Sequence, residues 1–167
     1  DLLFTDKTGT LTEGKMSVVS LLFAGGETFR DLSTLRRRCG ACTADLLSLG
    51  LRCGGATLDA GGRPVGGSAT ERALLDFVAG DPVPESCGVI SDLPFDSARK
   101  YSAVTWAGHG DRPVTVLLGA PELLLSAVRG AMTPEGGTAG HFSRAGVLSE
   151  LQRMNAGGGR GVAVAVC

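Results

Sequence analysis

Apolar residues recur at two different spacings along the chain. Near-helical spacing predicts one helix over residues 31–49, a second over 67–78 and a third over 143–156. Two strand-like runs, 101–106 and 114–118, flank a short glycine-containing stretch that predicts a hairpin turn. The chain therefore combines helices with strands.

Glycine-rich segments separate these runs. A turn rich in glycine predicts a hairpin between 16–23 and 27–30, and the stretch 51–67 predicts a connector or a loose hairpin. We expect Gly50 to stop the first helix in a left-handed cap. The segment 129–141 is expected to be a loop, and its pattern indicates no function.

Composition limits the classes of partner. The 167 residues are 43% hydrophobic, enough for about one domain with a substantial core. Sixteen basic and seventeen acidic side chains give a net charge of −1, and the basic run Arg36–Arg38 has no aromatic residues within it. We therefore expect no nucleic acid partner and predict that this run is a solvated helix face.

Membrane and metal signals are weak. No apolar stretch approaches the roughly 20 residues that a membrane-spanning helix needs. Cys39 and Cys42 have the spacing of a redox or metal-binding pair, but no second pair follows and both histidines lie far away in the sequence, so we expect reduced thiols.

The strongest chemical signal lies near the start of the chain. A short apolar run ends abruptly at Asp6, which predicts a buried strand with a carboxylate at its C-terminal tip. That carboxylate is a candidate nucleophile for a phosphoryl group. Lys7 and the hydroxyls of Thr8 and Thr10 would supply donors to the transferred oxygens, and Gly9 would let the backbone approach them closely.

The string from Asp6 to Thr12 resembles the phosphorylation motif of the P-type ATPases, membrane ion pumps that pass through an aspartyl-phosphate. The resemblance implies that Asp6 is the phosphorylated residue. Asp6 and the carbonyl of Thr8 could also offer two ligands to Mg²⁺. The further acidic ligand and the phosphate-binding lysine of the family are expected beyond Cys167.

Two later segments resemble the nucleotide-binding domain of the same pumps. The segment 67–71 is similar to its Gly-x-x-Thr-Glu element, which implies that Glu71 lies beside the adenine of ATP. Ser68 and Glu71 also have capping-box spacing, so Glu71 could instead only close its own helix. The segment 95–100 resembles the Phe-x-x-x-Arg-Lys element, which implies that Phe95 stacks on adenine and Lys100 reaches into the pocket. The alternative is a core phenylalanine and a surface lysine.

Two more elements follow in family order. The segment 119–122 matches the Gly-Ala-Pro-Glu element, with Gly119 permitting a close approach to the nucleotide, although Leu118 stands where many relatives carry lysine. The segment 160–165 looks like the family strand in which Arg160 faces the triphosphate. Alternatively, Arg160 merely flanks a strand.

The resemblance, more than the periodicity, implies the fold. We expect an α/β (α+β type) fold in which a twisted antiparallel sheet is flanked by helices, as in the nucleotide-binding domain of these pumps, over residues 16–167. Residues 1–15 are expected to hold one strand of a haloacid-dehalogenase-like phosphorylation domain with its Asp-Lys-Thr-Gly-Thr motif.

The function implied is that of an ATP-binding cytoplasmic domain in a cation-transporting ATPase, with ATP and Mg²⁺ as cofactors. The Gly-Ala-Pro-Glu element looks more like the calcium-pump branch than the heavy-metal branch, and the composition hints at a bacterial plasma membrane. The expected partners are the phosphorylation, actuator and transmembrane parts of the same pump, where the cation would bind. We expect the chain alone to bind ATP without turnover.

Two other classes stay open. A soluble haloacid-dehalogenase-type phosphatase or phosphotransferase would typically carry a second aspartate two positions after the nucleophile as general acid and base. Thr8 stands there and cannot take that role. A non-catalytic nucleotide-binding module is the third class.

Overall fold

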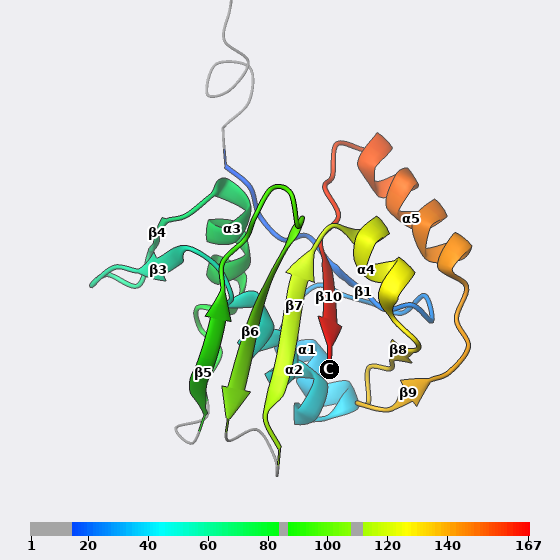
Figure 1. Cartoon of the computed structure of the whole chain (residues 1–167), viewed down its shortest axis with the longest axis horizontal. Coiled ribbons are helices and arrows are strands. Elements are labelled where there is room, and N and C mark those ends of the chain that lie inside the picture. The colour runs from blue at the N-terminus through cyan, green and yellow to red at the C-terminus, as the bar shows by residue number, and fades with distance from the viewer. Residues whose placement is uncertain (1–14, 84–86, 108–111) are drawn as a thin grey trace, which may run out of the picture.

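A four-stranded antiparallel sheet organises the part of the chain that the structure describes (Figure 1). The computed structural model describes residues 15–83, 87–107 and 112–167. The sheet has the order β10-β7-β6-β5. Its strands are β5 (Gly88–Leu93), β6 (Tyr101–Ala107), β7 (Val114–Gly119) and β10 (Ala163–Val166). The predicted hairpin of 101–106 with 114–118 is confirmed, whereas the strand expected over 160–165 begins later, at Ala163.

Helices flank this sheet. They are α1 (Leu32–Cys39), α2 (Ala41–Leu51), α3 (Ala69–Val78), α4 (Pro121–Ala127) and α5 (Arg144–Ala156). Figure 1 shows α1 and α2 behind the sheet and α5 beside α4 at the β10 edge. The expected α/β (α+β type) architecture, an antiparallel sheet flanked by helices, is confirmed. None of the helices in the described ranges is both long and apolar enough to cross a membrane.

Three small antiparallel hairpins complete the described elements. They are β1 (Leu21–Leu22) with β2 (Thr28–Phe29), β3 (Ala56–Leu58) with β4 (Pro64–Gly66), and β8 (Ala131–Met132) with β9 (Thr138–Ala139). The first two confirm the hairpins predicted around glycine-rich turns. The third corrects the expectation that 129–141 is a plain loop.

The predicted helix over 31–49 is in fact two helices. Gly40 separates α1 from α2 with a φ of 95°, a left-handed conformation that glycine adopts without strain. Gly50 does not cap the helix as predicted, because it lies inside α2, where any side chain would collide with Val116 of β7. The glycine therefore permits close packing of helix on sheet.

The core lies between the sheet and the helices behind it. Side chains of β6 alternate, and Ser102, Val104 and Trp106 are buried on one face. Val104 and Trp106 pack with Leu49 of α2. A larger cluster joins the first hairpin, α1, α2, α3 and the end of β7, and Leu118 belongs to it. The sheet edge that carries the candidate site is thus backed by a packed core.

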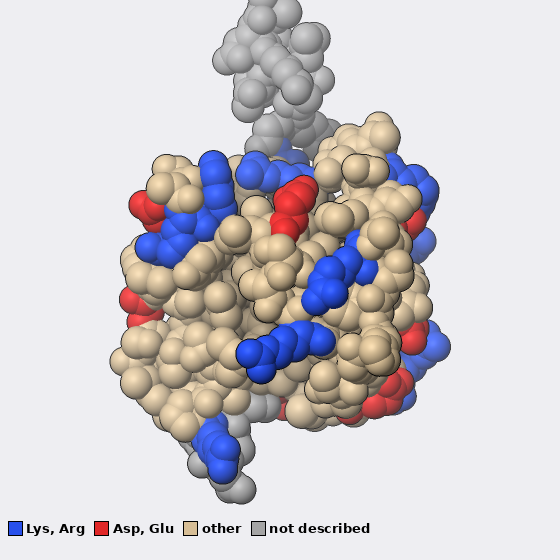
Figure 2. Space-filling view, turned by 45° about the vertical axis from the view of Figure 1, so that its right-hand side comes forward, with Lys and Arg blue, Asp and Glu red and all other residues tan. Residues whose placement is uncertain are grey.

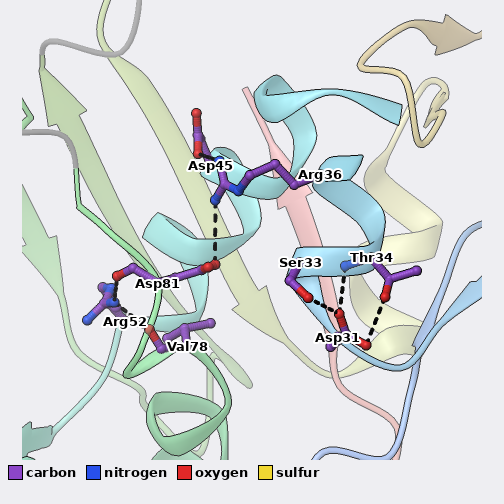
Figure 3. Close-up of polar contacts among 8 residues, drawn as sticks. All are labelled: Asp31, Ser33, Thr34, Arg36, Asp45, Arg52, Val78 and Asp81. Atoms are coloured by element: carbon purple, nitrogen blue, oxygen red, sulfur yellow. Dashed lines mark hydrogen bonds and ion pairs between the residues drawn. The ribbon is translucent and has the colours of Figure 1, made fainter. Parts of the chain in front are cut away.

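The basic run at the end of α1 is only partly solvated. Arg37 and Arg38 are exposed, but Arg36 forms ion pairs with Asp45 of α2 and Asp81 after α3 (Figure 3). The prediction of a solvated helix face is therefore confirmed for Arg37 and Arg38 and wrong for Arg36, which connects α1 to its neighbours.

Candidate functional site

The strand register brings several predicted nucleotide-binding residues to one edge of the sheet. Gly119, the last residue of β7, pairs with Tyr101 at the start of β6 on one side and with Ala163 at the start of β10 on the other. Lys100 immediately precedes β6, and Arg160 lies three residues before β10. This is the upper edge of the sheet in Figure 1.

Phe95 joins the same edge through the turn between β5 and β6. Leu93 at the end of β5 pairs with Ala103 of β6, so the turn 94–100 leaves and re-enters the sheet there. The Asp96 carboxylate accepts hydrogen bonds from the N–H groups of Ala98 (2.8 Å) and Arg99 (2.9 Å). Hydrogen bonds from the Arg99 and Ala98 N–H groups hold the pKa of Asp96 below its ordinary value. Asp96 therefore holds the turn in place through its ionised carboxylate.

Arg99 has a structural role in this turn. Its guanidinium donates to the carbonyls of Pro94 and Tyr101 and lies 5.4 Å from the centre of the Tyr101 ring. Both ends of the turn are thereby joined. Of the Arg-Lys pair recognised in the sequence, Arg99 is used within the fold and Lys100 is exposed.

Phe95 and Lys100 have properties that a purely structural role does not explain. The Phe95 side chain is 53% exposed, which excludes the alternative of a core phenylalanine. Lys100 has a φ of 65°, the one positive value at a non-glycine residue in the described ranges. A left-handed lysine costs roughly 1–2 kcal/mol, and such strain is often held at functional sites.

Gly119 is required by the backbone of Lys100. A Cβ atom on Gly119 would lie 2.6 Å from the Lys100 carbonyl oxygen and 2.6 Å from the Tyr101 Cβ. The next residue, Ala120, donates its N–H to that same carbonyl at 3.1 Å. The two elements recognised separately in the sequence therefore form one interlocked backbone unit.

Glu71 lies at the start of α3 and its carboxylate has two hydrogen bonds. The N–H of Ser68 donates to one oxygen (2.6 Å) and the N–H of Gly55 to the other (2.9 Å), while the Ser68 hydroxyl accepts from the Glu71 N–H. The predicted capping box is confirmed. Partial burial disfavours the charged form, but the hydrogen bonds from Gly55 and Ser68 outweigh it and lower the pKa of Glu71.

Two interactions relate the first turn of α3, which includes Glu71, to its surroundings. The hydroxyl of Thr70 donates to the Met16 sulfur at 3.7 Å, so the described chain begins beside the first turn of α3. Burial first, and the nearby Glu71 carboxylate in addition, raise the pKa of the Cys53 thiol, which interacts with Ser102 of β6. Glu71 therefore lies within electrostatic reach of a thiol that contacts the second residue of β6.

Leu118, at the position where the resemblance led us to expect lysine, is a core residue. Its side chain is 5% exposed and belongs to the larger apolar cluster, and its carbonyl accepts a hydrogen bond from the Ser102 hydroxyl at 3.4 Å. Leu118 therefore contributes packing, not charge, at the end of β7.

A surface cleft of about 230 Å³ adjoins this edge. It is lined by Ala120, Pro121 and Glu122, by Leu151 and Asn155 of α5, and by Arg160. Arg160 thus borders a cleft, whereas the other four predicted nucleotide residues, Glu71, Phe95, Lys100 and Gly119, do not line it. Asn155 was not singled out from the sequence, because only the packing of α5 beside α4 brings it here.

Basic side chains predominate on the face of the molecule that carries α4 and α5. Figure 2 brings forward the side of the molecule that carries α4 and α5. Basic side chains are spread over the middle of this face, whereas acidic side chains lie mostly toward its margins. Although the whole chain has a net charge of −1, this face would favour an anionic ligand.

The predicted phosphorylation segment cannot be placed in this geometry. Asp6, Lys7, Thr8 and Thr10 lie outside the described residues, and so do the predicted metal ligands Asp6 and Thr8. Within residues 15–83, 87–107 and 112–167, no three His, Cys, Asp or Glu side chains are grouped so that they could hold a metal ion. The predicted Mg²⁺ ligands therefore stay a prediction.

Known proteins that are similar to this chain are named as cation pumps. It is 33% identical over 125 residues to the probable cation-transporting ATPase exp7 of Streptococcus pneumoniae serotype 4, covering 75% of this chain and 13% of that protein. It is 31% identical over 136 residues to the probable cation-transporting ATPase I of two Mycobacterium tuberculosis strains, covering 77% of this chain and 8% of each relative. No protein-family model matches.

The chain thus spans roughly a tenth of the length of these curated relatives. It is similar to one segment of cation-transporting ATPases, and that similarity supports a domain of such an ATPase.

Proposed function

We propose that residues 16–167 form the nucleotide-binding domain of a P-type cation-transporting ATPase. In this proposal the adenine of ATP stacks on Phe95, with Lys100, Glu71 and Gly119 around it, and Arg160 faces the phosphates. The observation that carries the proposal is the shared sheet edge, where the turn that holds the exposed Phe95 and the strained Lys100 enters β6 opposite Gly119.

The exposed ring of Phe95 and the strained backbone of Lys100 fit nucleotide binding better than a purely structural role. A half-exposed phenylalanine contributes little to a core, but its free face can stack on a base, which is worth about 1–3 kcal/mol. Lys100 is strained yet exposed, so its ammonium is available to a ligand. The carboxylate of Glu71 caps its helix and can still accept a further hydrogen bond, since each oxygen has a second lone pair.

The proposal gives Asp6 the chemical step in the whole pump. Its carboxylate oxygen would attack the γ-phosphorus of ATP, forming an aspartyl-phosphate as the bond to the leaving ADP oxygen breaks. Lys7 and the hydroxyls of Thr8 and Thr10 would donate to the phosphoryl oxygens. Mg²⁺ at Asp6 and the Thr8 carbonyl would supply positive charge to offset the developing negative charge.

The remaining parts of the proposal concern the whole protein. The domain would lie on the cytoplasmic side of an integral membrane protein in a bacterial plasma membrane, together with phosphorylation, actuator and transmembrane parts. The transported cation would bind elsewhere in that protein. Calcium is the first cation to test, because the Gly-Ala-Pro-Glu element resembles the calcium-pump branch.

The decisive test of nucleotide binding is Phe95→Ala. Titration of the chain with ATP, followed by amide chemical shifts, should show an affinity loss of at least fivefold, as expected from about 1 kcal/mol or more of stacking. Thermal stability should stay unchanged because the ring is half exposed.

The matched control is Ile90→Ala, which removes a similarly exposed apolar side chain (57%) from β5. It should leave ATP affinity as in the parent chain. Equal affinity in the parent and Phe95→Ala would refute the adenine site.

A further inference from the structure

The cleft beside Gly119 is lined by both apolar and polar side chains. Pro121 is buried, Leu151 is partly buried, and a side chain at Gly161 would lie 2.6 Å from the Leu151 Cδ2. Glu122, Asn155 and Arg160 line the same cleft. None of these three side chains forms a hydrogen bond or ion pair with another residue in the described ranges. They are therefore available to a ligand.

The size of the cleft favours a part of a nucleotide. Pockets that enclose a whole drug-sized ligand measure about 300–1,000 Å³. A volume of about 230 Å³ is smaller and suits one ring with its substituents. Its wall begins at Ala120, whose N–H donates to the Lys100 carbonyl, so the cleft adjoins the proposed adenine site directly.

The hydrogen-bond donors and acceptors of Glu122, Asn155 and Arg160 further limit the class of ligand. An ionised carboxylate accepts hydrogen bonds only, a guanidinium donates only, and an amide does both. A phosphate placed beside Glu122 would be repelled, and an apolar ring would leave all three groups unpaired. A vicinal diol satisfies the carboxylate with two donated hydrogen bonds, which is how an acidic residue recognises ribose hydroxyls in dinucleotide-binding folds.

We propose that this cleft binds the ribose of the nucleotide and that Glu122 is its specificity residue. The 2′- and 3′-hydroxyls would donate to the Glu122 carboxylate, Asn155 would hydrogen-bond the sugar from α5, and Arg160 would extend toward the phosphates. This inference rests on the proposed ATP-binding function and adds a preference for ribonucleotides over nucleotides that lack the two hydroxyls.

The test compares ATP with 2′,3′-dideoxy-ATP in the 167-residue chain by amide chemical-shift titration. The parent should bind ATP about tenfold more tightly, as expected for hydrogen bonds to a charged group. In Glu122→Ala the ratio of the two dissociation constants should fall to about one. Asn155→Ala should lower the ratio less. Glu150→Ala, which removes a carboxylate of α5 that is paired with Arg153, should keep the parent's ratio.

Three outcomes overturn the inference in different ways. If the parent binds both nucleotides equally, the ribose assignment is wrong while ATP binding stands. If Glu122→Ala strengthens binding of both nucleotides equally and keeps the parent's ratio, Glu122 acts only by repelling phosphate. If neither nucleotide binds, the proposed function fails as well.

Discussion

Lys100 and Gly119 determine each other's backbone, although Lys100 lies just before β6 and Gly119 ends β7. The left-handed Lys100 directs its carbonyl at Ala120, and that approach leaves no space for a Cβ at Gly119. Lys100 and Gly119, which belong to separate motifs in the sequence, therefore constrain each other's backbone conformation. Their geometry gives the first of two predictions at the scale of single residues.

The first is that Gly119→Ala destabilises the fold. The new methyl group would lie 2.6 Å from the Lys100 carbonyl oxygen, and backbone atoms cannot move aside cheaply. We expect a loss of about 1–3 kcal/mol in the free energy of unfolding, measured by urea denaturation. Gly88→Ala is the matched control, because a Cβ on that sheet glycine meets no atom within 4 Å. Equal stability of the two variants would contradict the interlocked unit.

The second residue-scale prediction concerns Glu71 and pH. Its pKa is lowered in the folded state, so its contribution is fully present above the unfolded value, near 4.5, and is lost as the pH falls through the folded pKa. Glu71→Gln should therefore cost about 0.5–2 kcal/mol at pH 7, because the amide keeps only one of the two acceptor oxygens and loses the charge.

The difference between the parent and Glu71→Gln should shrink below pH 4.5. Urea denaturation of both proteins at several pH values measures it, and the contributions of Asp31 and Asp96, whose pKa values are also lowered, cancel between them. A pH-independent difference would mean that the carboxylate charge plays no part in the cap.

At the scale of elements, three helices are connected by arginines. Arg36 of α1 pairs with Asp45 of α2 and Asp81 after α3, and Arg52, which follows α2, donates to the carbonyls of Val78 and Asp81 (Figure 3). The Val78 carbonyl belongs to the last residue of α3 and also accepts from the Asp81 N–H, whereas Asp81 lies three residues beyond the helix. Arg52 therefore caps a helix that is distant in the sequence.

The prediction at this scale is that Arg52→Met lowers the free energy of unfolding by about 1–3 kcal/mol, the cost of losing two hydrogen bonds donated by a partly buried charged group. Methionine keeps most of the apolar stem, so the loss reports the hydrogen bonds. Arg63→Met is the control, because that side chain is 82% exposed and pairs only with Asp59 within the described ranges. Its effect should stay within about 0.5 kcal/mol. Similar losses in both variants would refute the capping role.

The sequence could predict those secondary-structure elements that are specified by residues close together in the chain. Ser68 and Glu71 specify the start of α3 within four residues, and glycine-rich turns specified two hairpins. It could not predict the division of the first helix, because Gly40 and Gly50 look alike in the sequence. Only the packing of α2 on Val116 shows that Gly50 continues the helix while Gly40 interrupts it.

At the scale of the whole molecule, the candidate site depends on the register of the sheet. Resemblance to a family supplied the residue types, but the pairing of Tyr101 with Gly119 and Ala163 is what brings their neighbours to one edge. Asn155 had no local signal, since its place in the cleft follows from the packing of α5 beside α4. A nucleotide would therefore contact residues from the turn before β6, the end of β7 and the segment before β10.

The last prediction follows from that distribution: ATP should bind weakly and with little dependence on Mg²⁺. Stacking on Phe95 and a few hydrogen bonds give an expected dissociation constant on the order of 1 mM, about −4 kcal/mol. Among the described residues no acidic cluster could hold the metal, so titrations with excess Mg²⁺ and with EDTA should agree within about threefold, or less than 1 kcal/mol. AMP should bind within about tenfold of ATP, because base and ribose supply most of the contact. Binding that requires Mg²⁺, or that is lost with AMP, would place the dominant contacts at the phosphates and contradict an adenine-centred site.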